Sequence, residues 1–241
     1  MTGLVRKATL FSACGLLLAG SAMAAVPSPA NSTIPANVNV VGTNGPLGAF
    51  AVMGPGGVDP AGAFTVVVRD LANNPIQNSS VVVDFTGASD IFLCTDAVPG
   101  LVVDCVTKTV RGFTDVTGSV TLYVVGAANN TGATGGLAAP GSGLDAVAIF
   151  ADGVNLGNVH ITAVLDQNGA VGGNGHNAQD LAFFRDDLGS AALFGTYRAR
   201  SDYNFDETNS GLDLSVFRDL LGASALGLGS ALGCPSATYC P

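Results

Sequence analysis

Along most of this chain the apolar residues recur at every second position, and the period changes near Asp166. The alternating runs are Phe64, Val66 and Val68, then Val81, Val83 and Phe85, then Val120, Leu122 and Val124. A period of two is typical of a β-strand with one buried face. Such strands must bury their apolar faces against a second sheet, so this region predicts a β-sandwich.

The turns between these runs follow a pattern of their own. An Asp-rich turn with Asn74-Pro75 separates the first two runs, and Thr114-Asp115 with Gly118 precedes a later one. Together with the strands, these turns resemble bacterial Ig-like domains of the invasin type over roughly residues 37–164. The resemblance implies a spacer or adhesion module and brings no catalytic residues with it.

Beyond Asp166 the pattern becomes helical. Residues 180–188 and 213–221 have apolar residues at helical spacing, and each stretch contains an Arg-Asp pair. Each stretch also follows a loop that is rich in Gly and Asn and begins with Asp. This repetition predicts a duplicated unit of loop and helix.

The second loop has the spacing of a calcium site. Asp202, Asn204, Asp206 and Asp213 occupy positions 1, 3, 5 and 12 of a twelve-residue loop, and the Thr208 carbonyl would add a neutral oxygen. A cation that prefers six to eight oxygens needs a chain that curls back on itself in this way. The alternative is that this Asp- and Asn-rich loop is a solvated turn. With Leu214 and Phe217, the motif resembles a type I dockerin repeat, which implies docking to a cohesin domain.

The first loop departs from this pattern. Asp166, Asn168 and Asp180 are in place, but Ala170 stands where the third acid belongs. Asp180 follows Asp166 by 14 positions, where the second loop has 11, and extra glycines at 172, 173 and 175 would have to bulge outward. The sequence therefore predicts a looser first site that binds calcium more weakly than the second.

The chain begins like an exported protein. A basic start at Arg6 and Lys7, an apolar run and a small-x-small site at residues 22–24 predict a signal peptide over residues 1–24. Lipidation of Cys14 is an alternative that Phe11 and the short apolar run disfavour. We expect a secreted or surface protein without a membrane span, divided into a sandwich (25–164), a dockerin-like module (165–224) and a C-terminal tail (225–241).

Four cysteines remain after cleavage, at positions 94, 105, 234 and 240. An even number in an exported chain indicates disulfides, and four cysteines allow three pairings. Closeness in sequence favours Cys94 with Cys105 and Cys234 with Cys240. Metal-binding or catalytic thiols are the alternative, but neither cluster has a neighbouring His.

Composition excludes some function classes. The net charge of −9 leaves no basic face for a nucleic acid. The sequence contains no serine-hydrolase, zinc-protease or phosphate-loop motif. The absence of Trp disfavours a surface on which sugars stack. His160 and His176 are each expected to be packed or solvent-facing. We therefore expect a protein that is not an enzyme.

Three functions fit these observations. The first is a protein whose calcium-dependent module docks to a cohesin-like or other surface partner, with the Ig-like domain as spacer or adhesion domain. The second is a surface or matrix structural protein whose calcium loops only stabilise the fold, and the third is an accessory subunit of a polysaccharide-degrading complex. The first two differ in whether the apolar helix residues are exposed or buried against the chain itself. These residues are Phe183, Phe184, Phe217 and Leu221.

Overall fold

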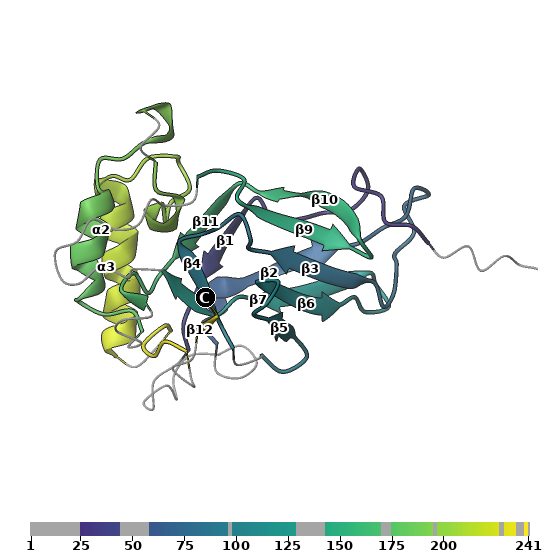
Figure 1. Cartoon of the computed structure of the whole chain (residues 1–241), viewed down its shortest axis with the longest axis horizontal. Helices are drawn as coiled ribbons and strands as arrows, with labels where there is room; N and C mark the ends of the chain where they lie inside the picture. Colours follow the sequence, from purple (N-terminus) through teal and green to yellow (C-terminus); the bar gives the residue numbers. More distant parts are fainter. Residues whose placement is uncertain are drawn as a thin grey trace, which may run out of the picture.

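The structure is a computed structural model, and it describes residues 25–43, 58–95, 98–128, 143–169, 175–194, 197–226, 229–234 and 239–240. These residues form mainly β-strands, and the described part contains two α-helices, which lie together at one end of the molecule (Figure 1). The predicted mainly β fold is confirmed. The predicted signal peptide lies outside the described residues, and within them no helix is long and apolar enough to cross a membrane.

One layer is an antiparallel sheet of five strands. Its order is β10 (Val154–Val159), β9 (Val147–Ala151), β3 (Ser80–Asp84), β6 (Thr109–Phe113) and β5 (Val102–Asp104). The alternation in the sequence decides which face is inside, since Val81 and Val83 are fully buried whereas Val82 is partly exposed.

Shorter sheets lie against this layer. They pair β2 (Ala63–Val67) with β7 (Ser119–Tyr123), β1 (Asn37–Val40) with β11 (Ile161–Val164), and β4 (Ile91–Cys94) with both β8 (Gly126–Ala128) and β12 (Tyr239–Cys240). The inward side chains of both layers belong to one hydrophobic cluster. This arrangement is consistent with the β-sandwich that the period of two predicts.

The predicted turns form through local hydrogen bonds. The Asp115 carboxylate accepts from the N–H groups of Thr117 and Ser119 at 2.8 and 3.1 Å. Gly118 has a φ of +77°, and a Cβ there would lie 2.6 Å from the Val68 carbonyl oxygen. Only glycine fits this position without a shift of the backbone.

The two helices pack their aromatic faces together. They are α2 (Asp180–Asp187) and α3 (Gly211–Ala225), and they confirm the helices expected at these positions. Phe184 stacks on Phe217 at 5.2 Å between ring centroids, and Tyr203 lies 5.9 Å from each ring. All three rings are buried in the same hydrophobic cluster as the sandwich. The described residues also contain three short 3₁₀ turns: η2 (Pro60–Gly62), η3 (Ala192–Phe194) and η4 (Ala199–Ser201).

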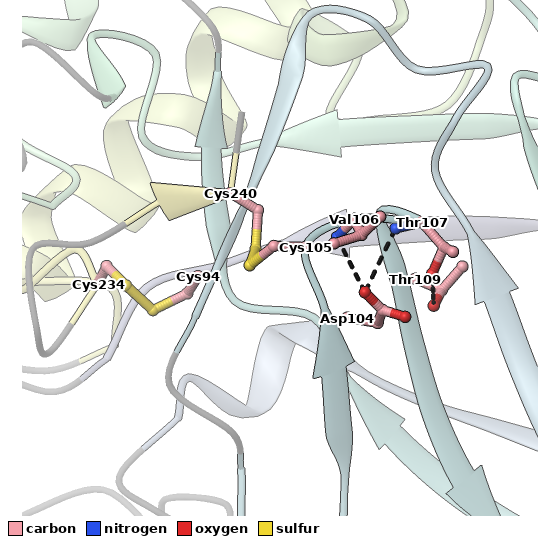
Figure 2. The surroundings of a disulfide bond; sticks show 8 residues. All are labelled: Cys94, Asp104, Cys105, Val106, Thr107, Thr109, Cys234 and Cys240. Atoms are coloured by element: carbon pink, nitrogen blue, oxygen red, sulfur yellow. Dashed lines mark hydrogen bonds between the residues drawn. A yellow bond between two sulfur atoms is a disulfide. The ribbon is translucent and has the colours of Figure 1, made fainter.

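The predicted disulfide pairing is wrong. Cys94 is bonded to Cys234, and Cys105 is bonded to Cys240 (Figure 2). Cys94 ends β4, whereas Cys105 follows β5 in the five-stranded sheet, so the two lie in different sheets despite their closeness in sequence. The C-terminal tail reaches both because β12 pairs with β4.

The tail is also held by hydrogen bonds to the sandwich. Leu232 and Thr43 exchange two backbone bonds of 2.8 Å each. The Ser230 hydroxyl accepts from the Gly42 N–H at 3.0 Å and donates to the Asp59 carboxylate at 2.8 Å. The helical region is therefore fastened to the sandwich at its start, through β11, and again at its end.

Candidate metal centre

The second loop is closed by the first turn of α3. Ser210 is the N-cap of this helix and forms a capping box with Asp213. One oxygen of Asp213 accepts from the N–H groups of Tyr203 and Asn204 at 2.9 and 3.1 Å, and the other accepts from the Ser210 N–H at 2.8 Å. Asp213 therefore holds the start of the loop against its end.

Between these ends the chain curls around Asp202. Its two carboxylate oxygens accept from the N–H groups of Asp206 and Glu207 at 3.2 and 2.8 Å. Phe205 and Glu207 both have a φ of +63°. Glu207 is at loop position 6, where calcium loops of this length use glycine for a sharp turn, so the loop makes that turn with a strained residue.

Three carboxylates converge inside this curl. One ligand oxygen from each of Asp202, Asp206 and Asp213 lies within 4.8 Å of the others, and Asp206 is the exposed member. Burial raises the pKa of Asp202, and the Asp213 carboxylate adds to the effect. Oxygen ligands and negative charge in this number suit a hard divalent cation such as calcium.

The remaining predicted ligands of this loop lie beside Asp206. The Asn204 amide donates to the Asp206 carboxylate at 3.0 Å, and its oxygen accepts from the Asp206 N–H at 3.1 Å. The Thr208 N–H donates to the other Asp206 oxygen at 3.0 Å. All five predicted residues of the second loop therefore belong to one small curl, and their role as ligands stays a prediction.

The first loop repeats the closure of the second. One oxygen of Asp180 accepts from the N–H groups of Gln167 and Asn168 at 2.7 and 2.9 Å, and the other accepts from the Asn177 N–H at 2.7 Å. As in the second loop, one oxygen of the closing aspartate accepts from the two residues that follow the first aspartate of the loop, and the other accepts from the residue three positions before the closing aspartate. The duplication predicted from the sequence therefore extends to the backbone contacts of the closing aspartate.

Oxygens in the first loop are left without partners. Among the described residues, one carboxylate oxygen of Asp166 and the side-chain oxygen of Asn168 are buried without a hydrogen-bond donor. Burial and, next, the charge of Asp180 raise the pKa of Asp166 to about 7, while burial raises the pKa of Asp180 to about 6. A cation would relieve both the missing partners and the repulsion. Ala170 and the glycines at 172 and 173 lie outside the described residues.

Sequence reasoning missed the side chains that support these loops. The Tyr197 hydroxyl donates to Asp202 at 2.5 Å. His160, from the sandwich, bridges Asp145 and Glu207 at 3.2 and 3.0 Å. Tyr197 lies five positions before Asp202, outside the residues that the calcium motif specifies, and His160 lies 47 positions before Glu207, so neither contact follows from the motif.

A buried ion pair is the other feature that was missed. Arg200 is fully buried and donates to both oxygens of Asp187, at the end of α2, at 2.8 and 3.0 Å. Asp90, on the segment that leads into β4, lies 4.0 Å from the same guanidinium. Charged groups are rarely buried unless they are paired. Because Asp90 belongs to the sandwich and Arg200 and Asp187 to the helical region, this cluster of charges helps to fix the helical region on the sandwich.

Comparisons with known proteins add little. No family model and no curated protein matches the chain. A solved structure, the adhesin InvE of Yersinia pseudotuberculosis, shares 17% sequence identity over 58% of this chain and 29% of that chain, with a TM-score of 0.21. The chain thus matches less than a third of that adhesin's length, and a likeness this weak carries no argument about fold or function.

Proposed function

We propose that this chain is an exported, non-catalytic protein of a cell surface or extracellular matrix, in which a calcium-stabilised helical cap is fixed to an Ig-like β body. The observation that carries the proposal is the convergence of Asp202, Asp206 and Asp213 in a loop that closes on α3. A divalent ion there would neutralise three carboxylates and tie the loop to the helix.

The burial of the helix faces favours a cap over a docking module. Docking through the helices requires their apolar residues at the surface, but Phe184 and Phe217 are buried and Phe183 and Leu221 are only partly exposed. The two disulfides further hold the segment after α3 on the sandwich. These contacts support the structural role over the cohesin-type docking that the dockerin resemblance implies.

Calcium binding is tested on the mature chain by thermal unfolding in calcium and in chelator. At a hundredfold excess over the dissociation constant, an ion that binds only the folded chain adds about 2.7 kcal/mol. For a protein of this size that corresponds to a rise in Tm of about 5–10 °C. Asp206→Asn should lose most of the rise because it removes one of the converging charges without disturbing a buried group.

Asp219→Asn is the matched control, since this exposed aspartate lies on α3 outside the loop. It should respond to calcium as the unaltered chain does. An equal response in Asp206→Asn, or no response of the unaltered chain, would contradict the proposed calcium site. Hydrogen exchange in the same two buffers should show that calcium protects the loop and the start of α3 more than the sandwich strands.

A further inference from the structure

The C-terminal tail lies against the first loop of the helical region. A Cβ placed on Gly233 would lie 3.2 Å from one carboxylate oxygen of Asp166, Oδ2, and 2.6 Å from the hydroxyl oxygen of Tyr239. The carboxylate oxygen and the hydroxyl therefore border one small space, which any side chain at position 233 would fill. Neither Gly233 nor Tyr239 belongs to the duplicated unit of loop and helix, which ends with α3.

The Asp166 oxygen that borders this space is the one without a hydrogen-bond donor. The Gly175 nitrogen borders the same space but makes no hydrogen bond to this oxygen. Asp166 is fully buried, and the side-chain oxygen of Asn168, a residue that is only 6% exposed, is also buried without a donor. Burial of polar oxygens is costly unless a donor or a cation faces them. These two oxygens therefore point to a bound cation.

The tail and the sandwich enclose the first loop between them. On the sandwich side, the Ala128 N–H donates to the Asp166 carbonyl at 2.8 Å, and a Cβ on Gly169 would overlap the Ala128 carbonyl oxygen. On the tail side, the His176 N–H donates to the Ser230 carbonyl at 2.8 Å. The Gly169 N–H donates to the second Asp166 oxygen, Oδ1, at 2.8 Å, which leaves Oδ2 directed at the tail.

The charge of these side chains matches one divalent cation. Asp166 and Asp180 are fully buried, and the charge of Asp180 is, after burial, the next cause of the raised pKa of Asp166. Burial lowers the pKa of the neighbouring His176, so its ring adds no positive charge near neutral pH. Because an uncompensated buried charge is costly, two carboxylates require two positive charges. Calcium fits better than magnesium, since magnesium usually keeps several waters and an enclosed site leaves little room for them.

Both tail residues at this site immediately precede a bridged cysteine. Gly233 comes before Cys234 and Tyr239 before Cys240, and Figure 2 shows the two disulfides that fasten these cysteines to the sandwich. The Cys234 N–H donates to the Tyr239 hydroxyl at 3.1 Å, which joins the two positions directly. The disulfides therefore hold Gly233 and the Tyr239 hydroxyl beside Asp166.

We propose that the C-terminal tail completes a calcium site in the first loop. The Tyr239 hydroxyl supplies one oxygen, and the loop supplies those of Asp166, Asn168 and Asp180. Ala170 leaves this loop one acidic ligand short of the pattern, and the hydroxyl oxygen of the tail makes up the number. An ion at this site holds the tail on the loop, and the disulfides in turn raise the affinity for the ion. The proposal needs no ion in the second loop.

Calcium titration of the isotope-labelled mature chain, followed by amide NMR, observes both loops in one sample. The amides of Gln167, Asn168 and Gly169 report on the first loop, and those of Tyr203 and Asn204 on the second. The titration should reach about 10 mM, because extracellular calcium modules have dissociation constants of about 10⁻⁴–10⁻³ M. The first-loop amides should shift and reach saturation.

Three variants of the tail test its part in the site. Tyr239→Phe removes only the hydroxyl oxygen and should weaken the first-loop affinity at least about tenfold, the smaller loss that removal of a supporting partner causes at metal sites. Gly233→Ala places a methyl group beside Asp166 Oδ2 and should abolish the first-loop shifts. Replacing Cys105 and Cys240 by alanine should weaken the affinity about 5- to 150-fold, the usual range of coupling between two sites.

Tyr123→Phe and Gly143→Ala are the matched controls, since Tyr123 lies on β7 and a Cβ on Gly143 would meet nothing within 4 Å. Both should bind calcium as the unaltered chain does, and non-reducing peptide maps verify that the bridges remain in Tyr239→Phe and Gly233→Ala. First-loop amides that do not shift, or an unchanged first-loop affinity in Tyr239→Phe, would overturn the proposal. First-loop shifts without second-loop shifts would support it and would contradict the calcium site proposed for the second loop.

Discussion

Removal of the disulfides one at a time and together should show that they act as a pair. Cys94 and Cys234 are 140 positions apart, and a closed loop of that length stabilises by about 5 kcal/mol on the chain-entropy relation. Once this bridge is closed, the bridge between Cys105 and Cys240 closes a ring of only about 20 residues, worth about 3 kcal/mol. The same reasoning holds when the order is reversed.

Replacing the cysteines of either bridge by alanine should therefore lower the free energy of unfolding by about 3 kcal/mol. Replacing all four should lower it by about 8 kcal/mol. The combined loss exceeds the sum of the single losses by about 2 kcal/mol, because only the last bridge to go releases the long loop. Bridges within the segments 94–105 and 234–240 would instead close two independent short rings, whose losses add. Removing the sulfur atoms also leaves cavities, which lower the free energy of unfolding. This cost is the same in the single and the combined variants, so it cancels when the combined loss is compared with the sum of the single losses.

The assay is urea unfolding of the oxidised mature chain and of the three alanine variants near neutral pH. Slopes of the transition should be compared as well as midpoints, since release of a long loop exposes more surface in the unfolded chain. Additive losses, or a Cys94–Cys105 peptide in a non-reducing digest, would refute the reasoning.

Two further predictions concern pH. The hydrogen bonds that the His160 ring donates to Glu207 and then to Asp145 raise the pKa of His160 above its ordinary 6.5. Their stabilising effect is therefore complete below 6.5 and is lost as the pH rises through the folded-state pKa. NMR titration should show this raised pKa, and Glu207→Gln should bring it back toward 6.5. The raised pKa of about 7 for Asp166 and about 6 for Asp180 means that, in chelator, stability falls as the pH rises from the ordinary carboxylate range near 4 to about 7. Melting curves should show that calcium suppresses this fall and that Asp166→Asn flattens it, whereas an unchanged pH profile in that variant would show that the fall has another source.

Local features were predictable because a few neighbouring residues decide them. The turn at Asp115 needs only its own carboxylate and the glycine at 118, and both lie within four residues of each other. The closure of the second loop depends on Asp213 three positions after Ser210, a capping pattern that the sequence shows directly. The strands likewise follow from alternation within five or six residues.

Contacts between distant segments were not predictable in the same way. The disulfide partners depend on which sheet each cysteine joins, and closeness in sequence pointed to the wrong pairing. Burial of Arg200 could not be expected from composition, because an arginine is buried only when tertiary structure brings acids to it. The absence of hydrogen-bond partners for one oxygen each of Asp166 and Asn168 was not predictable from the sequence either. In the sequence, Ala170 made the first loop look the poorer calcium site.

These distant contacts decide whether the helical region can act as an independent module. An independent module would need a core of its own, but Phe184, Tyr203 and Phe217 share their cluster with the sandwich. An independent module would also need at least one free end. The helical region instead begins directly after β11 and is followed by a tail that two disulfides bind to the sandwich. The pair of Arg200 and Asp187 near Asp90 adds a buried electrostatic contact whose rupture would leave an uncompensated charge. The helical region therefore does not unfold as a separate unit. An ion bound in the second loop would stabilise the whole chain, because the loop belongs to that single unit.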